Sequence, residues 1–100
     1  MSNKRWTSIR INREALAYMG RRFSDVREEF GVRRERLAED IDISPTSVYR
    51  WEKGGDMKLS SFIWFCGGLG IDPGELLNEA LEAHPEPVES FLPKEPKEDV

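Results

Sequence analysis

The chain contains one cysteine, one histidine and no long hydrophobic run. Cys66 has no second cysteine to pair with, which excludes an internal disulfide and fits a reducing compartment. His84 and Cys66 alone build neither a metal site nor a nucleophile–base pair, and no glycine-rich phosphate loop is present. We therefore expect no catalytic residues, no metal and no cofactor. Cys66 falls on an apolar helical stripe and is expected in the core.

No apolar run approaches the roughly 18–20 residues that cross a membrane, and no signal peptide is evident at the start. These absences favour a cytoplasmic protein without membrane contact. Hydrophobic residues make up 38% of the chain and charged residues 34%, which is ordinary for one small soluble domain.

The net charge of −4 argues at first against nucleic acid as a partner. Its distribution argues the other way, because residues 1–58 carry 13 Lys/Arg and 10 Asp/Glu whereas residues 59–100 carry 2 and 9. A basic half followed by an acidic half is a weak indication of a nucleic-acid-binding part with an acidic appendage.

Helical periodicity predicts an all-α fold of five helices within residues 12–83. The first helix follows Asn12 as N-cap, ends at Gly31, and can break at Gly20; its apolar stripe is Leu16, Met19, Phe23, Val26 and Phe30. Residues 33–40 form a short second helix with inward Leu37, Ala38 and Ile41. Ser44-Pro45 opens a third helix with inward Val48 and Trp51, which Gly54-Gly55 ends.

The fourth and fifth helices show similar patterns. Ser60 is the expected cap of the fourth and Gly70 its end; its stripe is Leu59, Phe62, Phe65, Cys66 and Leu69. Asp72-Pro73 opens the fifth, whose apolar residues are Leu76, Leu77, Ala80 and Leu81.

Two flanking segments differ in composition from this domain. The basic arm, residues 1–11, carries Lys4, Arg5 and Arg10 among the apolar Trp6, Ile9 and Ile11; it either enters a DNA minor groove or is a frayed terminus. The acidic tail, residues 84–100, holds four of the six prolines and is expected to be disordered. Its apolar residues offer a possible protein contact: Val88, Phe91 and Leu92.

Residues 33–53 read as a helix-turn-helix. Ala38 supplies the small residue that two steeply crossing helices need at their contact. The second helix keeps an outward face without large apolar side chains, formed by Pro45, Thr46, Ser47, Tyr49, Arg50 and Lys53.

Phe23–Leu77 resembles the lambdoid phage repressor and Cro family, also called the xenobiotic-response-element family. The resemblance rests on Val26-Arg27, Gly31-Val32, Glu35, Leu37-Ala38, Ile43-Ser44, Val48, Arg50–Gly54, Leu69–Ile71 and Leu76-Leu77. It implies a five-helix domain that binds pseudo-palindromic double-stranded DNA operators as a homodimer.

The resemblance also implies roles for single residues. Base reading falls to Pro45, Thr46, Ser47 and Arg50. Phosphate contacts fall to Arg34 and Lys53. Beside the resemblance, we expect Arg33, Ser44 and Lys58 to contact phosphate as well, and Tyr49 either to contact phosphate or to be simply exposed. Arg27 and Glu52 are expected to form a structural ion pair. Two departures stand out, since Asp42 replaces the glycine usual in the turn and Pro45 cannot hydrogen-bond to a base.

Trp64 falls on the outer face of the fourth helix, where folding alone does not explain it. We expect a dimer contact there; docking of Phe91 and Leu92 and a lone surface tryptophan are the alternatives. The chain is thus predicted to be a DNA-binding transcriptional regulator, phage-like or bacterial. An antitoxin or protein-interaction adaptor acting through the tail remains the second reading.

Overall fold

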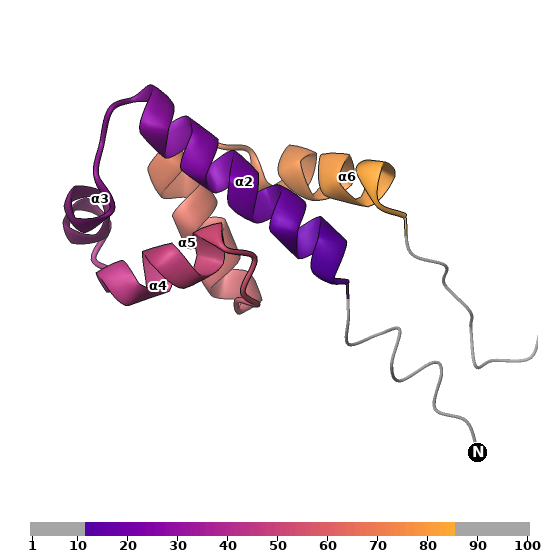
Figure 1. Ribbon diagram of the computed structural model, residues 1–100, viewed down its shortest axis with the longest axis horizontal. Coiled ribbons are helices and arrows are strands. Elements are labelled where there is room, and N and C mark those ends of the chain that lie inside the picture. Colours follow the sequence, from indigo (N-terminus) through magenta and orange to yellow (C-terminus); the bar gives the residue numbers. More distant parts are fainter. Residues whose placement is uncertain (1–11, 86–100) are drawn as a thin grey trace, which may run out of the picture.

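The computed structural model describes residues 12–85, which form five α-helices and no strand within that range. They are α2 (Arg13–Glu29), α3 (Arg34–Asp40), α4 (Pro45–Glu52), α5 (Leu59–Leu69) and α6 (Pro73–Ala83) (Figure 1). The predicted all-α class is confirmed. The basic arm and residues 86–100 of the tail, including Val88, Phe91 and Leu92, lie outside the described residues. No described helix is long and apolar enough to cross a membrane.

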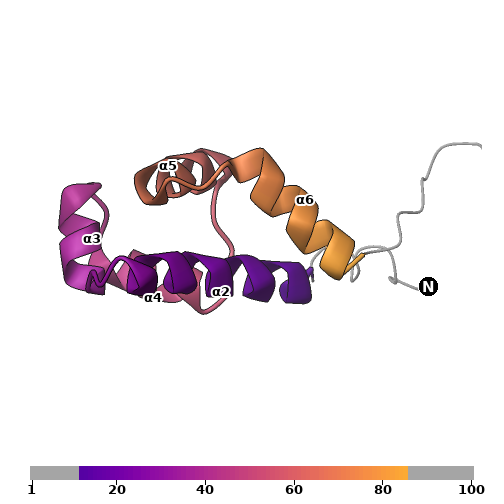
Figure 2. The ribbon, with the colours of Figure 1, turned by 90° about the horizontal axis from the view of Figure 1, so that it is seen from above.

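Three helices, α4, α5 and α6, pack against the longest helix, α2, while α3 packs against α4. In Figure 1, α4 and α6 lie on opposite sides of α2, and both contact it. Figure 2 shows α3 closing one end of the molecule, with α5 and α6 on one side of α2. This arrangement places the α3–α4 pair at the surface, with its inner side against the core.

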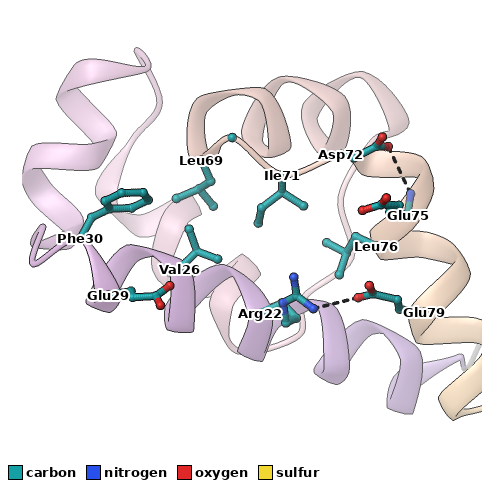
Figure 3. A pocket seen from close by; sticks show the side chains of 11 residues that line it. Arg22, Val26, Glu29, Phe30, Leu69, Ile71, Asp72, Glu75, Leu76 and Glu79 are labelled. Carbon is teal, nitrogen blue, oxygen red and sulfur yellow. Dashed lines mark hydrogen bonds and ion pairs between the residues drawn. The ribbon is translucent and has the colours of Figure 1, made fainter.

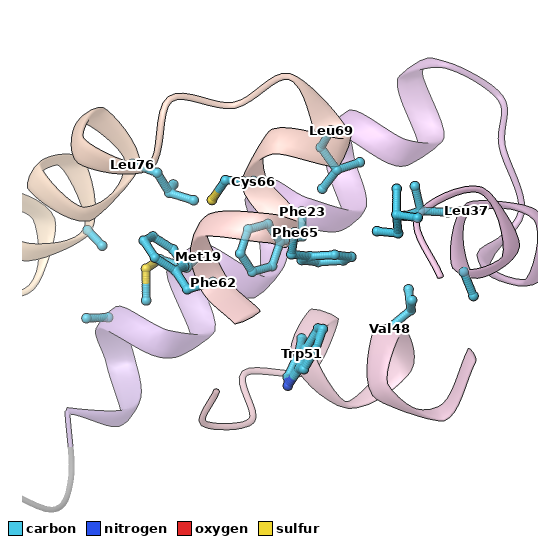
Figure 4. Packing of buried hydrophobic residues seen from close by; sticks show 14 residues of the cluster. Met19, Phe23, Leu37, Val48, Trp51, Phe62, Phe65, Cys66, Leu69 and Leu76 are labelled. Atoms are coloured by element: carbon cyan, nitrogen blue, oxygen red, sulfur yellow. The ribbon is translucent and has the colours of Figure 1, made fainter. Parts of the chain in front are cut away.

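Aromatic side chains fill the centre of the core (Figure 4). Phe23 of α2 meets Phe65 of α5 edge-on at 4.7 Å between ring centroids, and Phe65 meets Trp51 of α4 at 5.3 Å. Cys66 is fully buried beside them, as its place on an apolar stripe predicted. Burial, reinforced by the charge of Asp72, raises the pKa of its thiol to about 11. Cys66 is therefore a packing residue.

Most predicted helix ends are confirmed. Gly31 and Gly70 both adopt positive φ angles, at 68° and 73°. Ser44 Oγ accepts the Ser47 backbone N–H at 3.1 Å, and Asp72 Oδ1 accepts that of Gly74 at 2.9 Å, each just before the predicted N-terminal proline.

One predicted cap is confirmed only in position, and one is wrong. Asn12 is the N-cap residue of α2, but its side chain makes no capping hydrogen bond, and its Oδ1 is buried without a partner among the described residues. Ser60 lies inside the first turn of α5, because that helix already begins at Leu59 with Lys58 as N-cap. Similarly, α3 begins at Arg34, and Arg33 is its N-cap.

Four apolar residues of the predicted helices are exposed: Phe30, Leu59, Leu77 and Leu81. Phe30 follows the last residue of α2 and Leu59 is the first of α5, so both lie where their helix has left the core; they are 71% and 70% exposed. Leu77 and Leu81 share the outer edge of the α6 stripe and are each 39% exposed.

The predicted helix break at Gly20 is also wrong, because α2 runs unbroken from Arg13 to Glu29. Gly20 is buried, and a Cβ on it would lie only 2.6 Å from the backbone oxygen of Glu52 and 2.8 Å from that of Trp51. The glycine is therefore needed for the close approach of α4 to the backbone of α2.

Candidate nucleic-acid interface

Helices α3 and α4 are joined by the tight turn Ile41–Ser44. Asp42 takes the left-handed conformation at φ 59°, so it does the work of the glycine usual at this place. The backbone N–H of Ile43 then donates to the Ala38 carbonyl at 2.9 Å, which closes the turn. Ala38 and Val48, 1% and 0% exposed, lie on the inner side of the two helices. The geometry is that of a helix-turn-helix.

The outward face of α4 carries Pro45, Thr46, Tyr49 and Arg50, all exposed. Its opposite face is anchored in the core by Val48 and Trp51. Predicted base-reading residues thus share a polar surface on a helix whose position is fixed from behind.

The two serines at the start of α4 are occupied by the cap. Ser44 Oγ accepts from the Ser47 N–H and itself donates to Ser47 Oγ at 3.0 Å. Ser47 is half-buried, whereas Thr46 and Arg50, one turn apart, are both exposed. Among the predicted readers, Thr46 and Arg50 therefore present the most accessible hydrogen-bonding groups.

The loop after α4 holds the stem of Arg50. The Gly55 N–H donates to the Arg50 carbonyl at 2.9 Å, and a Cβ on Gly55 would lie 2.8 Å from Arg50 Cγ. The Arg50 guanidinium also lies over the Trp51 ring at 6.0 Å. These contacts limit the positions that the guanidinium can take, which preorganises an exposed cation.

The predicted ion pair between Arg27 and Glu52 is present in the structure. Arg27 Nε donates to Glu52 Oε2 at 2.6 Å and its Nη2 donates to Oε1 at 3.1 Å, while Nη1 donates to the Val32 carbonyl at 2.7 Å. The side chains are 8% and 1% exposed. The hydrogen bonds to Glu52 raise the pKa of Arg27 against the opposing effect of burial. The pair ties α2 to the end of α4.

Glu52 has a second cationic partner that sequence reasoning missed. Arg34 Nε donates to Glu52 Oε1 at 2.8 Å. The Arg34 guanidinium and the Lys53 ammonium also lie over the exposed Tyr49 ring, at 5.1 and 5.4 Å from its centroid. The structure thereby brings three predicted phosphate contacts, Arg34, Tyr49 and Lys53, into one cluster.

The other predicted phosphate contacts are not part of that cluster. Arg33 and Lys58 are exposed N-cap residues of α3 and α5, and neither is paired with an acidic side chain between residues 12 and 85.

The contact between Arg34 and Glu52 could not be predicted from the spacing of residues in the sequence. Gly20 interrupts a regular helical pattern, but that pattern fits a helix break as well as a close packing contact, so it did not identify the approach of α4.

Trp64 is less isolated than predicted. Its indole Nε1 donates to the Ile41 carbonyl at 2.8 Å, so it braces the end of α3, yet 58% of the residue stays exposed. It lines a groove of about 600 Å³ between α3 and α5, together with Ile41, Ile63 and Gly67.

No group of three or more metal-ligating side chains occurs among residues 12–85.

Comparison with known proteins agrees with this geometry. Residues 24–63 match the family model described as Helix-turn-helix. The fold is similar to the crystal structure of the clp gene regulator ClgR from C. glutamicum, at 27% identity and a TM-score of 0.58, over 72% of this chain and 90% of that one. Curated proteins gave no significant match. The matched region is thus similar to helix-turn-helix domains, and the two matches support a DNA-binding transcriptional regulator.

Proposed function

We propose that this protein regulates transcription by placing α4 in the major groove of a specific DNA operator. The observation that carries the proposal is the exposed polar face of α4, held from behind by Val48 and Trp51 and flanked by the cluster of Arg34, Tyr49 and Lys53. A rigid helix with short polar side chains at its front and cations at its edge suits this form of recognition.

Within this proposal, Arg50 reads guanine through its two-pronged guanidinium, while Thr46 contacts a neighbouring base. Pro45 supplies apolar contact to a thymine methyl, and Ser47 supports the start of the helix. Arg33, Arg34, Tyr49, Lys53 and Lys58 contact phosphates and set the register of the protein on the duplex. Ser44 joins them by turning its hydroxyl proton from Ser47 Oγ to a phosphate oxygen. The Glu52 bond uses only Nε of Arg34, so its terminal nitrogens can reach phosphate.

The proposed active species on DNA is a homodimer with Trp64 at its interface. A two-fold dimer presents two copies of α4 to half-sites one DNA turn apart. The source of the operator, in a phage or a bacterial genome, follows from the gene's neighbours.

Selection from a random pool of double-stranded DNA tests the function. The proposal predicts enrichment of one pseudo-palindromic motif, with half-sites about 10 base pairs apart. A Thr46→Ala/Arg50→Ala variant serves as the control and should enrich no such motif. Equal recovery of all sequences by the unaltered protein would contradict the proposal and favour a protein-interaction role.

A further inference from the structure

A second groove, of about 270 Å³, lies between the C-terminal half of α2 and the start of α6 (Figure 3). Its lining includes the apolar residues Val26, Leu69 and Ile71. It lies along the side of α2 that faces α6, whereas α4 packs on the other side (Figure 1). The groove is therefore separate from the proposed DNA interface.

The rim of this groove is acidic. Four carboxylates line it, from Glu29, Asp72, Glu75 and Glu79, against the single guanidinium of Arg22. Arg22 already pairs with Glu79 at 2.8 Å, and between residues 12 and 85 neither Glu29 nor Glu75 has an ion-pair partner. An apolar lining with an acidic rim fits a ligand that carries both cations and apolar side chains.

We propose that the N-terminal segment of the same chain folds back along α2 and docks its Lys4–Trp6 end in this α2–α6 groove. That end carries two cations, Lys4 and Arg5, beside the apolar Trp6. Its charge and its apolar content thus complement both parts of the groove. The proposal concerns an intramolecular contact and stands independently of DNA binding.

The position of Asn12 makes the groove reachable. The end of α6 lies beside the start of α2, with His84 Nδ1 3.6 Å from a carboxylate oxygen of Glu14. The seam between the two helices therefore leads from the start of α2 towards the groove, which Val26 and Glu29 line further along α2.

The lengths also match. Along α2, Val26 lies about 21 Å beyond the level of Asn12, at about 1.5 Å per residue. Trp6 precedes Asn12 by six residues, which span about 20 Å when extended. A segment folded back along the seam brings Trp6 level with Val26 and places Lys4 and Arg5 near Glu29.

Trypsin under native conditions tests the docking, because it cleaves after Arg5 and Arg10 only where the segment is accessible. The test variant is Glu29→Gln/Glu75→Gln in the full chain. Losing two exposed ion pairs lowers the docked-to-free ratio about two- to thirtyfold, so cleavage after Arg5 should accelerate. Asp25→Asn/Glu82→Gln is the matched control, since it removes one charge from each of the same two helices outside the groove; its cleavage should equal that of the unaltered protein.

A nitroxide at Ser8→Cys gives a second readout that needs no protease. Docking predicts broadening of the Val26 and Ile71 amide resonances, sparing Val48, and loss of that broadening in the Glu29→Gln/Glu75→Gln protein. Buried Cys66 stays unlabelled. Equal cleavage in all three proteins, or absence of broadening at Val26, would overturn the proposal. Protection that disappears on dilution would overturn it too, by assigning the groove to the arm of a second copy.

Discussion

Two glycines within helices show how differently the same residue is used. Gly20 lies against the backbone oxygens of Trp51 and Glu52, whereas Gly67 has no atom within 4 Å of the position that a Cβ would take. The first glycine allows α4 to approach α2, and the second only loosens α5. Their helical settings are similar, so substitution by alanine separates packing from helix propensity.

Gly20→Ala should destabilise the protein by about 1–3 kcal/mol, because backbone oxygens cannot move aside as a flexible side chain can. Gly67→Ala, its matched control, should stabilise the protein by up to about 1 kcal/mol through helix propensity alone. Urea unfolding followed by circular dichroism measures both. Equal free energies of unfolding for the two variants would show that the contact at Gly20 is not tight.

The two arginines on Glu52 allow a similar comparison. Arg27 is 8% exposed and Arg34 36% exposed at the side chain. Arg27→Met should cost up to about 3–5 kcal/mol, because it leaves the buried Glu52 with only the more exposed Arg34 as a partner, whereas Arg34→Met should cost about 1 kcal/mol or less. A double-mutant cycle of Arg27→Met with Glu52→Gln measures the coupling by urea unfolding. Coupling near zero, or equal costs for the two arginines, would refute the assignment.

At the scale of single elements, the sequence predicted best what depends on neighbouring residues. Ser44-Pro45 and Asp72-Pro73 begin helices because cap and proline act within one turn. Ser60 also has cap chemistry but lies inside α5, and Asn12 holds the N-cap position of α2 without making a side-chain bond. The Arg27–Glu52 pair was expected from family resemblance, whereas the Arg34 contact depends on how α3 and α4 cross and leaves no local pattern.

The cluster of Arg34, Tyr49 and Lys53 joins α3 to the end of α4. Lys53→Gln should weaken binding to selected and unrelated DNA alike, and reduce the slope of log affinity against log salt by about 1. Binding measured by fluorescence anisotropy over a salt series tests this. Arg21→Gln, an exposed change on α2 outside the cluster, is the control and should leave the slope unaltered. An unchanged slope for Lys53→Gln would remove Lys53 from the phosphate contacts.

In the whole molecule, a cluster with two cations and a groove with an acidic rim lie on different surfaces. The cluster of Arg34, Tyr49 and Lys53 lies on the α3–α4 side, and the carboxylates of the α2–α6 groove lie across α2 from it. Sequence patterns could place these charges on helices but could not place the helices around α2. The groove at Trp64 could likewise not be predicted from the sequence, because it depends on how α3 lies against α5.

A test of the proposed dimer asks whether the groove at Trp64 is its interface. Trp64→Ala should shift sedimentation on DNA from two protomers towards one, because it removes a 58% exposed indole from the interface. Leu81→Ala, a partly exposed apolar change on α6, is the control. Trp64→Phe keeps the ring but loses the bond to Ile41, so it separates bracing of α3 from contact with a partner. Unchanged sedimentation of Trp64→Ala would exclude Trp64 as the dimer contact.

If α4 reads bases, Arg50→Ala should weaken binding to two DNAs by different amounts. Affinity for the selected motif and for a shuffled sequence is compared at one salt concentration, with Arg21→Ala as an exposed control. We expect a loss of about 1–3 kcal/mol on the motif, relaxed preference at one base pair, and a much smaller loss on the shuffled DNA. Equal losses on both DNAs would contradict it, because Arg50 would then contact only the phosphate backbone.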